Sequence, residues 1–74
     1  MDKYIVIEIQ MSADGTVAHL TYVKDTIEEA ESTYFTMLAA AAISELPVHS
    51  AAVLTMSGVA IRHYGYDRRS AASE

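Results

Sequence analysis

The chain has 74 residues, of which 51% are hydrophobic, and a formal net charge of −5. This length allows one domain with a small core. With no cysteine for disulfides and three scattered histidines that lack zinc-ligand spacing, self-association is the stabilising device that remains, so we expect a homo-oligomer. The negative charge disfavours a general nucleic-acid binder, which needs a positive field.

Residues 4–11 predict a half-buried strand because polar and apolar side chains alternate along them. The apolar set comprises Ile5, Ile7, Ile9 and Met11. Asp14-Gly15 predicts a tight turn, since this pair tolerates the positive φ that hairpins need. A second strand is therefore expected over residues 16–23.

The register of this first hairpin follows from its turn. If the Asp-Gly pair is central, Ile9 faces Leu20 and Ile7 faces Tyr22, which gives one apolar and one polar face. A slip by one residue would set Ile9 against His19 and mix the two faces. The first register is therefore predicted.

A helix is predicted over residues 27–45. Thr26–Glu29 has a capping-box pattern, with Asp25–Glu28 as a competing cap. Apolar residues then recur at helical spacing, and Pro47 ends the element. The main apolar stripe comprises Ile27, Ala30, Tyr34, Met37, Leu38 and Ala41.

A second hairpin is predicted over residues 48–66, with its turn at Ser57-Gly58. Two registers are open. A two-residue loop would pair Leu54 with Ile61, whereas a three-residue loop with a left-handed Gly58 would pair Val53 with Ile61.

Chain direction then predicts an α+β fold of the ββαββ type. It is a four-stranded antiparallel sheet of order 2-1-3-4 with one helix on one face. Residues 1–66 would form this domain and residues 67–74 a flexible polar tail. The other face would carry Val6, Val23 and half of the second hairpin. That face, or edge strands two and four, is the expected interface between copies.

The most suggestive stretch for binding interleaves arginine with tyrosine. Arginine presents a planar fork to phosphate or carboxylate, and tyrosine presents a stacking surface, which suits a nucleotide or an anionic peptide. The alternative is a solvated edge strand that runs into a charged tail. The candidate ligand-binding residues are Arg62, His63, Tyr64, Tyr66, Arg68 and Arg69.

No catalytic, metal-ligating or cofactor-binding set is predicted. His19 has only Glu8 as a conceivable partner and reads as a surface residue. The neighbours in His49-Ser50 point to opposite faces of a strand, so they cannot form a nucleophile–base pair. His49 is instead expected near Gly65 or Tyr66 across the hairpin.

Five segments within about residues 4–66 carry a likeness to known proteins, namely 4–10, 13–16, 29–32, 38–42 and 47–51. Through them the chain resembles a group of very small proteins carried by phages and prophages of gut Firmicutes. These are fold-forming segments, so the resemblance implies a phage context and transfers no functional residue. Small phage proteins of this kind are often accessory factors, including inhibitors of host defence, or are encoded near tail genes.

The expected function is therefore that of a non-enzymatic, homo-oligomeric phage accessory protein. It would bind a host protein or a small anionic ligand, for example by sequestering a nucleotide signal of host defence. The alternatives are a structural or assembly component of the phage particle and a nucleic-acid-acting small oligomer. No signal peptide and no apolar stretch of about 20 residues are visible, so the host cytoplasm is the expected location.

Overall fold

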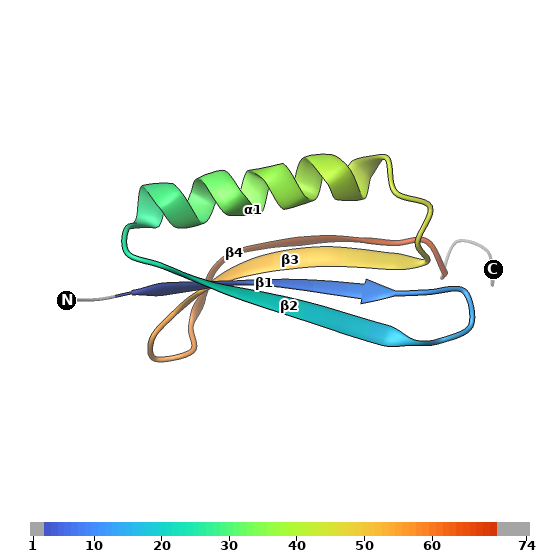
Figure 1. The fold of residues 1–74 in the computed structure, drawn as a ribbon, viewed down its shortest axis with the longest axis horizontal. Coiled ribbons are helices and arrows are strands. Elements are labelled where there is room, and N and C mark those ends of the chain that lie inside the picture. The colour runs from blue at the N-terminus through green and yellow to red at the C-terminus, as the bar shows by residue number, and fades with distance from the viewer. Residues whose placement is uncertain (1–2, 70–74) are drawn as a thin grey trace.

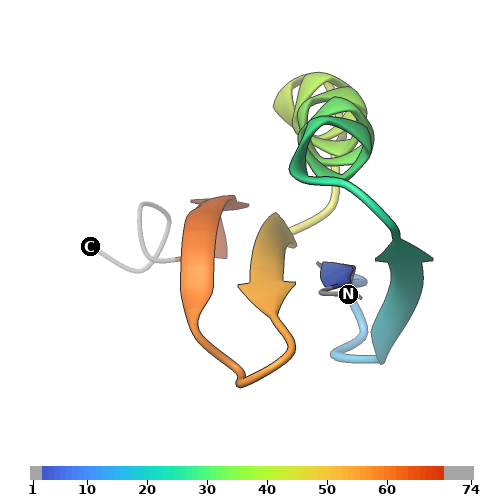
Figure 2. The same cartoon turned by 90° about the vertical axis from the view of Figure 1, so that its left-hand side faces the viewer.

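A computed structural model of the chain describes residues 3–69, in which two hairpins flank one helix (Figure 1). The elements are β1 (Tyr4–Met11), β2 (Val17–Lys24), α1 (Ile27–Ala42), β3 (Val48–Thr55) and β4 (Ala60–Asp67). The strands form one antiparallel sheet in the order β2-β1-β3-β4. Figure 2 shows the four strands side by side with α1 over one face. The predicted fold class and strand order are thereby confirmed.

The first hairpin uses a longer loop than the sequence pattern suggested. The Gly15 amide donates to the Ser12 carbonyl oxygen at 3.0 Å, and the Ser12 amide donates to the Thr16 carbonyl oxygen at 2.9 Å. Three residues therefore lie between the last bonded pair, with Gly15 in the left-handed region at φ 91°. Each residue of β1 therefore pairs with the β2 residue one position before the predicted one, so Ile9 pairs with His19 rather than with Leu20. The predicted register was wrong.

The side of the sheet covered by the helix also differs from the prediction. Val6 and Glu8 lie buried beneath α1, whereas the isoleucines of β1 face away from it. On this side Val6 and Val53 of the sheet are fully buried in one apolar cluster with Ala30, Tyr34 and Met37 of the helix. The expectation that Val6 lies on the uncovered face was wrong, whereas Val23 does lie there, paired with Ile5.

The helix begins at the predicted cap. Thr26 has an extended backbone, and its hydroxyl oxygen accepts a hydrogen bond from the Glu29 amide at 3.1 Å. The Glu29 carboxylate reaches back to the Asp25 amide at 3.3 Å. The first bond satisfies an amide that a helix start leaves free, and the second holds the amide just before the cap, so Thr26 is confirmed as the N-cap.

The helix ends at Ala42, earlier than the predicted residue 45. The Ser44 amide donates to the Ala41 carbonyl oxygen at 3.2 Å, and the Ser44 hydroxyl accepts from the Leu46 amide at 3.0 Å. This local serine turn redirects the chain before Pro47 is reached.

The second hairpin has the three-residue loop that was one of its two predicted forms. The Gly58 amide donates to the Thr55 carbonyl oxygen and the Thr55 amide to the Val59 carbonyl oxygen, both at 2.9 Å. Gly58 occupies the left-handed region at φ 88°, where a side chain would be strained.

A bulge then changes the pairing of β4. Leu54 pairs with Ala60 as this loop requires, but the register shifts at the next position, so Val53 pairs with Arg62 and not with Ile61. Neither predicted pairing of Ile61 occurs, because a bulge inserts one unpaired residue. The shift places Arg62 on the same side as the buried Val53, facing the helix.

The fold continues beyond residue 66. β4 ends at Asp67, and the Arg68 amide donates to the Pro47 carbonyl oxygen at 2.7 Å. The rest of the predicted flexible tail, residues 70–74, lies outside the described residues. Within residues 3–69, no helix combines the length and apolar character that crossing a bilayer requires.

Candidate functional site

The six residues predicted to bind a ligand do not form one surface. Three of them lie on the helix side of β4, because their partners on β3 are the buried residues of that side. The pairs are Arg62 with Val53, Tyr64 with Ala51 and Tyr66 with His49. His63 pairs with Ala52 on the opposite face. Arg68 and Arg69 follow the end of the strand, where Arg68 reaches the C-terminal end of the helix and Arg69 binds Asp67.

Arg62 connects β4 to the helix. Its Nε donates to Glu31 Oε2 at 2.5 Å, and its guanidinium lies over the Phe35 ring, 5.6 Å from the centroid. The predicted anion-binding fork is therefore occupied by a carboxylate of the same chain. Because both charged groups keep contact with solvent, the pair adds little stability by itself.

Arg68 holds the C-terminal end of the helix. Its Nη2 donates to the Ala41 carbonyl oxygen at 2.8 Å, and its Nη1 donates to the Leu46 carbonyl oxygen at 3.0 Å. The guanidinium also stacks on the Tyr66 ring at 5.2 Å. The last turn of α1 contains no basic residue, so Arg68 supplies the positive charge that the negative end of the helix dipole favours.

Replacing Arg68 by alanine is expected to lower the free energy of unfolding by about 1.5–3 kcal/mol, the usual range for hydrogen bonds to a charged group. Urea denaturation followed by circular dichroism measures this loss. Arg69→Ala is the matched control and should change stability much less, as expected of an exposed residue. Equal effects of the two substitutions would contradict the capping role of Arg68.

Arg69 is bound by its own strand end. Its guanidinium donates twice to the Asp67 carboxylate, from Nε at 3.0 Å and from Nη2 at 2.8 Å. These hydrogen bonds, with the attraction of opposite charges, raise the pKa of Arg69 above its usual value. The guanidinium groups of Arg62, Arg68 and Arg69 thus all have protein partners.

The structure contains a buried acid–base pair that the sequence pattern did not indicate. His49 Nε2 lies 2.6 Å from Glu8 Oε2, and both side chains are buried between the sheet and the helix. The Gln10 amide lies beside them, with its Nε2 3.5 Å from the same ring nitrogen. His49 Nδ1 is also buried and has no hydrogen-bond partner.

This pair lacks the access that catalysis requires. Neither Glu8 nor His49 lines either of the hollows described below. His49 pairs with Tyr66 across the hairpin, as expected, and its neighbour Ser50 pairs with Gly65 on the other face. A Ser–His nucleophile is therefore impossible here, and we interpret the Glu8–His49 pair as structural.

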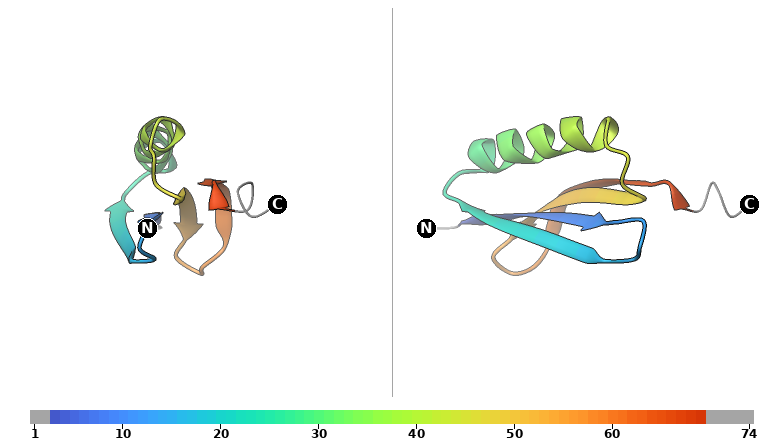
Figure 3. Two further views of the ribbon diagram at one scale, coloured as in Figure 1. Left: turned by 90° about the vertical axis from the view of Figure 1, so that its right-hand side faces the viewer. Right: turned by 45° about the vertical axis from the view of Figure 1, so that its right-hand side comes forward.

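The sheet side away from α1, which we call the open face, carries a row of apolar side chains that the helix does not cover. No described segment covers it in Figure 2 or in either view of Figure 3. Its residues on the three strands β1, β2 and β3 are Ile5, Ile7, Ile9, Met11, Val17, His19, Thr21, Val23, Val48, Ser50, Ala52 and Leu54. A shallow hollow of about 250 Å³ lies on this face near Ala52 and Gly65, where side chains are small.

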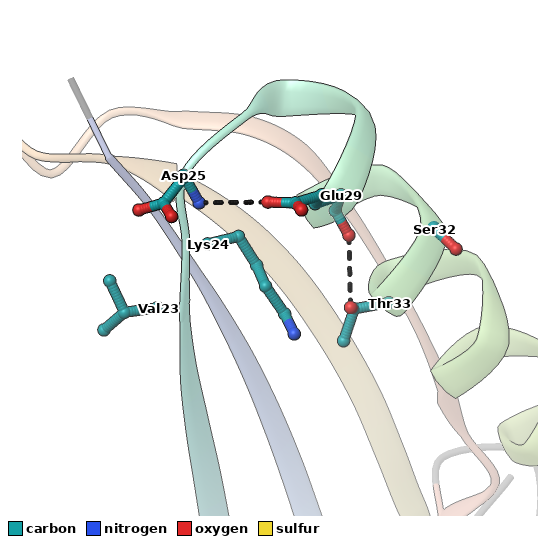
Figure 4. A pocket seen from close by; sticks show the side chains of 6 residues that line it. All are labelled: Val23, Lys24, Asp25, Glu29, Ser32 and Thr33. Atoms are coloured by element: carbon teal, nitrogen blue, oxygen red, sulfur yellow. Dashed lines mark hydrogen bonds between the residues drawn. The ribbon is translucent and has the colours of Figure 1, made fainter. Parts of the chain in front are cut away.

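A larger hollow, of about 420 Å³, lies where β2 joins α1 (Figure 4). The polar groups that line it already form hydrogen bonds within the chain. The Glu29 carboxylate accepts from the Asp25 amide, and the Glu29 carbonyl oxygen accepts from the Thr33 hydroxyl at 3.1 Å. The Lys3 ammonium beside Asp25 lowers the pKa of that carboxyl through a hydrogen bond and through its charge. The hollow is therefore the flank of a helix cap.

Residues 3–69 contain no group of three histidine, aspartate or glutamate side chains that could hold a metal ion. No protein-family model, curated protein or solved structure matches the chain. The functional argument therefore rests on the geometry of the open face and of the sheet edges.

Proposed function

We propose that this protein is a non-enzymatic, homo-oligomeric accessory protein of the phage type and that it acts by binding through its open face. The observation that carries the proposal is the row of Ile5, Ile7, Ile9 and Met11, which faces away from the helix that covers the rest of β1. Exposed apolar patches of this kind on small domains mark interaction surfaces.

The size of the core supports self-association. The buried apolar cluster comprises Val6, Ala30, Tyr34, Met37, Ala51 and Val53. Among residues 3–69, the largest fully buried side chains are the two valines Val6 and Val53. Each square ångström of apolar surface removed from water contributes roughly 25 cal/mol, so covering the open face with another copy would add a second apolar layer to this small core.

A protein partner suits this surface better than a small anion. The open face is apolar, and the three candidate arginines already bind Glu31, Asp67 and the carbonyl oxygens at the helix end. A nucleotide would have to displace these contacts. A panel of nucleotides in differential scanning fluorimetry tests that branch, and a raised melting temperature that Arg62→Ala abolishes would favour the nucleotide over a host protein.

Ile9→Lys is expected to lower the mass of the oligomer in multi-angle light scattering. A charge at this site on the open face cannot be buried against another copy without a large desolvation cost. Ile9 is already 38% exposed, so the substitution should leave the fold intact by circular dichroism. Ile43→Lys, at a site 85% exposed beyond the helix end, is the matched control and should not change the mass.

The wild-type protein should have a mass above the 8.1 kDa of one chain at micromolar concentration. A wild-type mass equal to that of one chain would overturn self-association. If instead both lysine variants kept the wild-type mass, the open face would be excluded as the contact between copies.

A further inference from the structure

The edge strand β2 exposes apolar side chains on both of its faces. On the helix side, Leu20 is 49% and Tyr22 39% exposed, and on the open face, Val17 is 59% and Val23 62% exposed. Strands with apolar residues on both faces usually lie inside a sheet, covered on both sides. Within residues 3–69, no strand pairs with the outer side of β2, and α1 packs mainly over β1 and β3.

The position of the helix explains the exposure on its own side. α1 lies over the central strands β1 and β3, and both end-on views show β2 at the margin, beyond the cover of the helix (Figures 2 and 3). Leu20 and Tyr22 therefore project beside the helix rather than beneath it.

The backbone of β2 offers a regular row of unpaired groups. The bond from the Ser12 amide to Thr16 begins the ladder between β1 and β2. Because bonded and non-bonded pairs alternate in an antiparallel ladder, the backbone groups of Val17, His19, Thr21 and Val23 point outward from the sheet. These donors and acceptors can form a ladder with another strand.

The opposite edge is protected, whereas β2 is not. β4 contains a bulge beside Arg62, and its end carries the Asp67–Arg69 ion pair. Bulges and charges are the usual means of preventing edge-to-edge pairing. β2 pairs regularly with β1 along its whole length, contains no proline and carries a single charge, Lys24, at its end.

We propose that β2 pairs antiparallel with β2 of a second copy, with Leu20 opposite Leu20, so that two sheets join into one continuous sheet. The proposal rests on the self-association proposed above and names the strand and register through which two copies meet. It concerns the sheet edge and is independent of the contact made by the open face.

Symmetry restricts the register. A twofold axis perpendicular to the sheet leaves every side chain on its own face of the joined sheet. The residues whose backbone groups point outward all lie on the open face, so they pair with one another across the axis. Centring the axis on Leu20 sets Val17 against Val23 and His19 against Thr21, so all four outward residues form ladder bonds.

The same register matches the side chains. On the helix side it sets the small Ala18 against the large Tyr22, and Lys24 falls opposite Thr16 rather than another charge. Centring the axis on Thr21 would leave Val17 without a partner in the strand. The register centred on Leu20 therefore gives the longest ladder and the better packing.

Single-cysteine variants test the register directly, because the natural chain has no cysteine. Opposed residues of a non-bonded antiparallel pair have Cα atoms about 4.5 Å apart, within the range that a disulfide spans. Leu20→Cys should therefore form a covalent dimer on mild oxidation, seen on a non-reducing gel. Tyr22→Cys is the matched control on the same face and should crosslink at least tenfold less, because its symmetry mate lies several residues away.

Thr21→Pro provides a second readout. The Thr21 amide points outward, so proline there removes no bond within the chain but blocks pairing with another β2. The mass in light scattering should fall by about half, with unchanged circular dichroism. His63→Pro is the matched control on the other edge strand, β4. The Arg68–Pro47 bond fixes which residues of β4 bond to β3, and by the same alternation the His63 amide points outward. This variant should not change the mass.

The outcomes separate the two proposals. A wild-type mass above that of one chain, together with no preferential crosslinking of Leu20→Cys and no effect of Thr21→Pro, would overturn the edge contact and leave self-association standing. Stronger crosslinking of Tyr22→Cys would overturn the register. A wild-type mass of one chain would overturn both proposals.

Discussion

Replacing Glu8 by alanine is expected to destabilise the protein by about 1–3 kcal/mol, the usual cost of leaving a buried polar group without its hydrogen-bond partner. The His49 ring would remain buried beneath the helix without the carboxylate that lies 2.6 Å from Nε2. Its Nδ1 already lacks a partner, and Nε2 would keep the Gln10 amide nitrogen at 3.5 Å. Urea denaturation followed by circular dichroism measures the change in the free energy of unfolding.

A double-mutant cycle separates the pair from its surroundings. Glu8→Leu takes the carboxylate from His49, and His49→Leu takes the imidazole from Glu8, whereas the double variant removes both members of the buried pair. The double variant is therefore expected to be more stable than either single variant. A loss below about 1 kcal/mol for Glu8→Ala, as found for exposed ion pairs, would show that the pair contributes nothing specific to the fold.

Gly65→Ala is expected to cost about 1–3 kcal/mol, as overpacking of a close contact usually does. A Cβ at position 65 would lie 2.5 Å from the Ser50 Cβ and 3.4 Å from the Ser50 Cα, so β3 and β4 would have to separate. The requirement for glycine here comes from close approach of the two strands.

The matched test for this contact is Ser50→Gly. By itself it should destabilise the strand by about 0.5–1 kcal/mol, the ordinary cost of glycine in a strand interior. Combined with Gly65→Ala it removes the clashing atom, so the double variant should recover most of the stability lost by Gly65→Ala. Strictly additive losses would mean that the clash with Ser50 does not cause the effect.

Local chemistry made several features predictable from sequence. Alternation of apolar side chains indicated the strands, and the Thr26–Glu29 cap set the start of the helix. Chain direction and the rule of right-handed crossovers then determined the strand order. Gly58 indicated a left-handed loop position because little else tolerates positive φ. These features depend on short segments and simple topology.

The candidate site was less predictable, because each of its residues is placed by a partner distant in sequence. Arg62 was identified as a basic side chain, but its contact with Glu31 follows from the bulge and from the position of the helix. Arg68 was predicted to lie in a flexible tail, yet it holds the end of a helix through the Ala41 carbonyl oxygen. A linear pattern of charges contains neither relationship.

The sequence by itself determined the elements, their order and the excess of apolar side chains on both faces of the sheet. Tertiary structure decided which face the helix covers, and therefore that Glu8 is buried with His49, 41 residues away, while the isoleucines of β1 stay uncovered. The physical reason is that both faces of β1 and β3 carry apolar side chains. The choice between them is made by packing between distant segments, in which Val6 and Val53 of the sheet join Ala30 of the helix in one buried cluster.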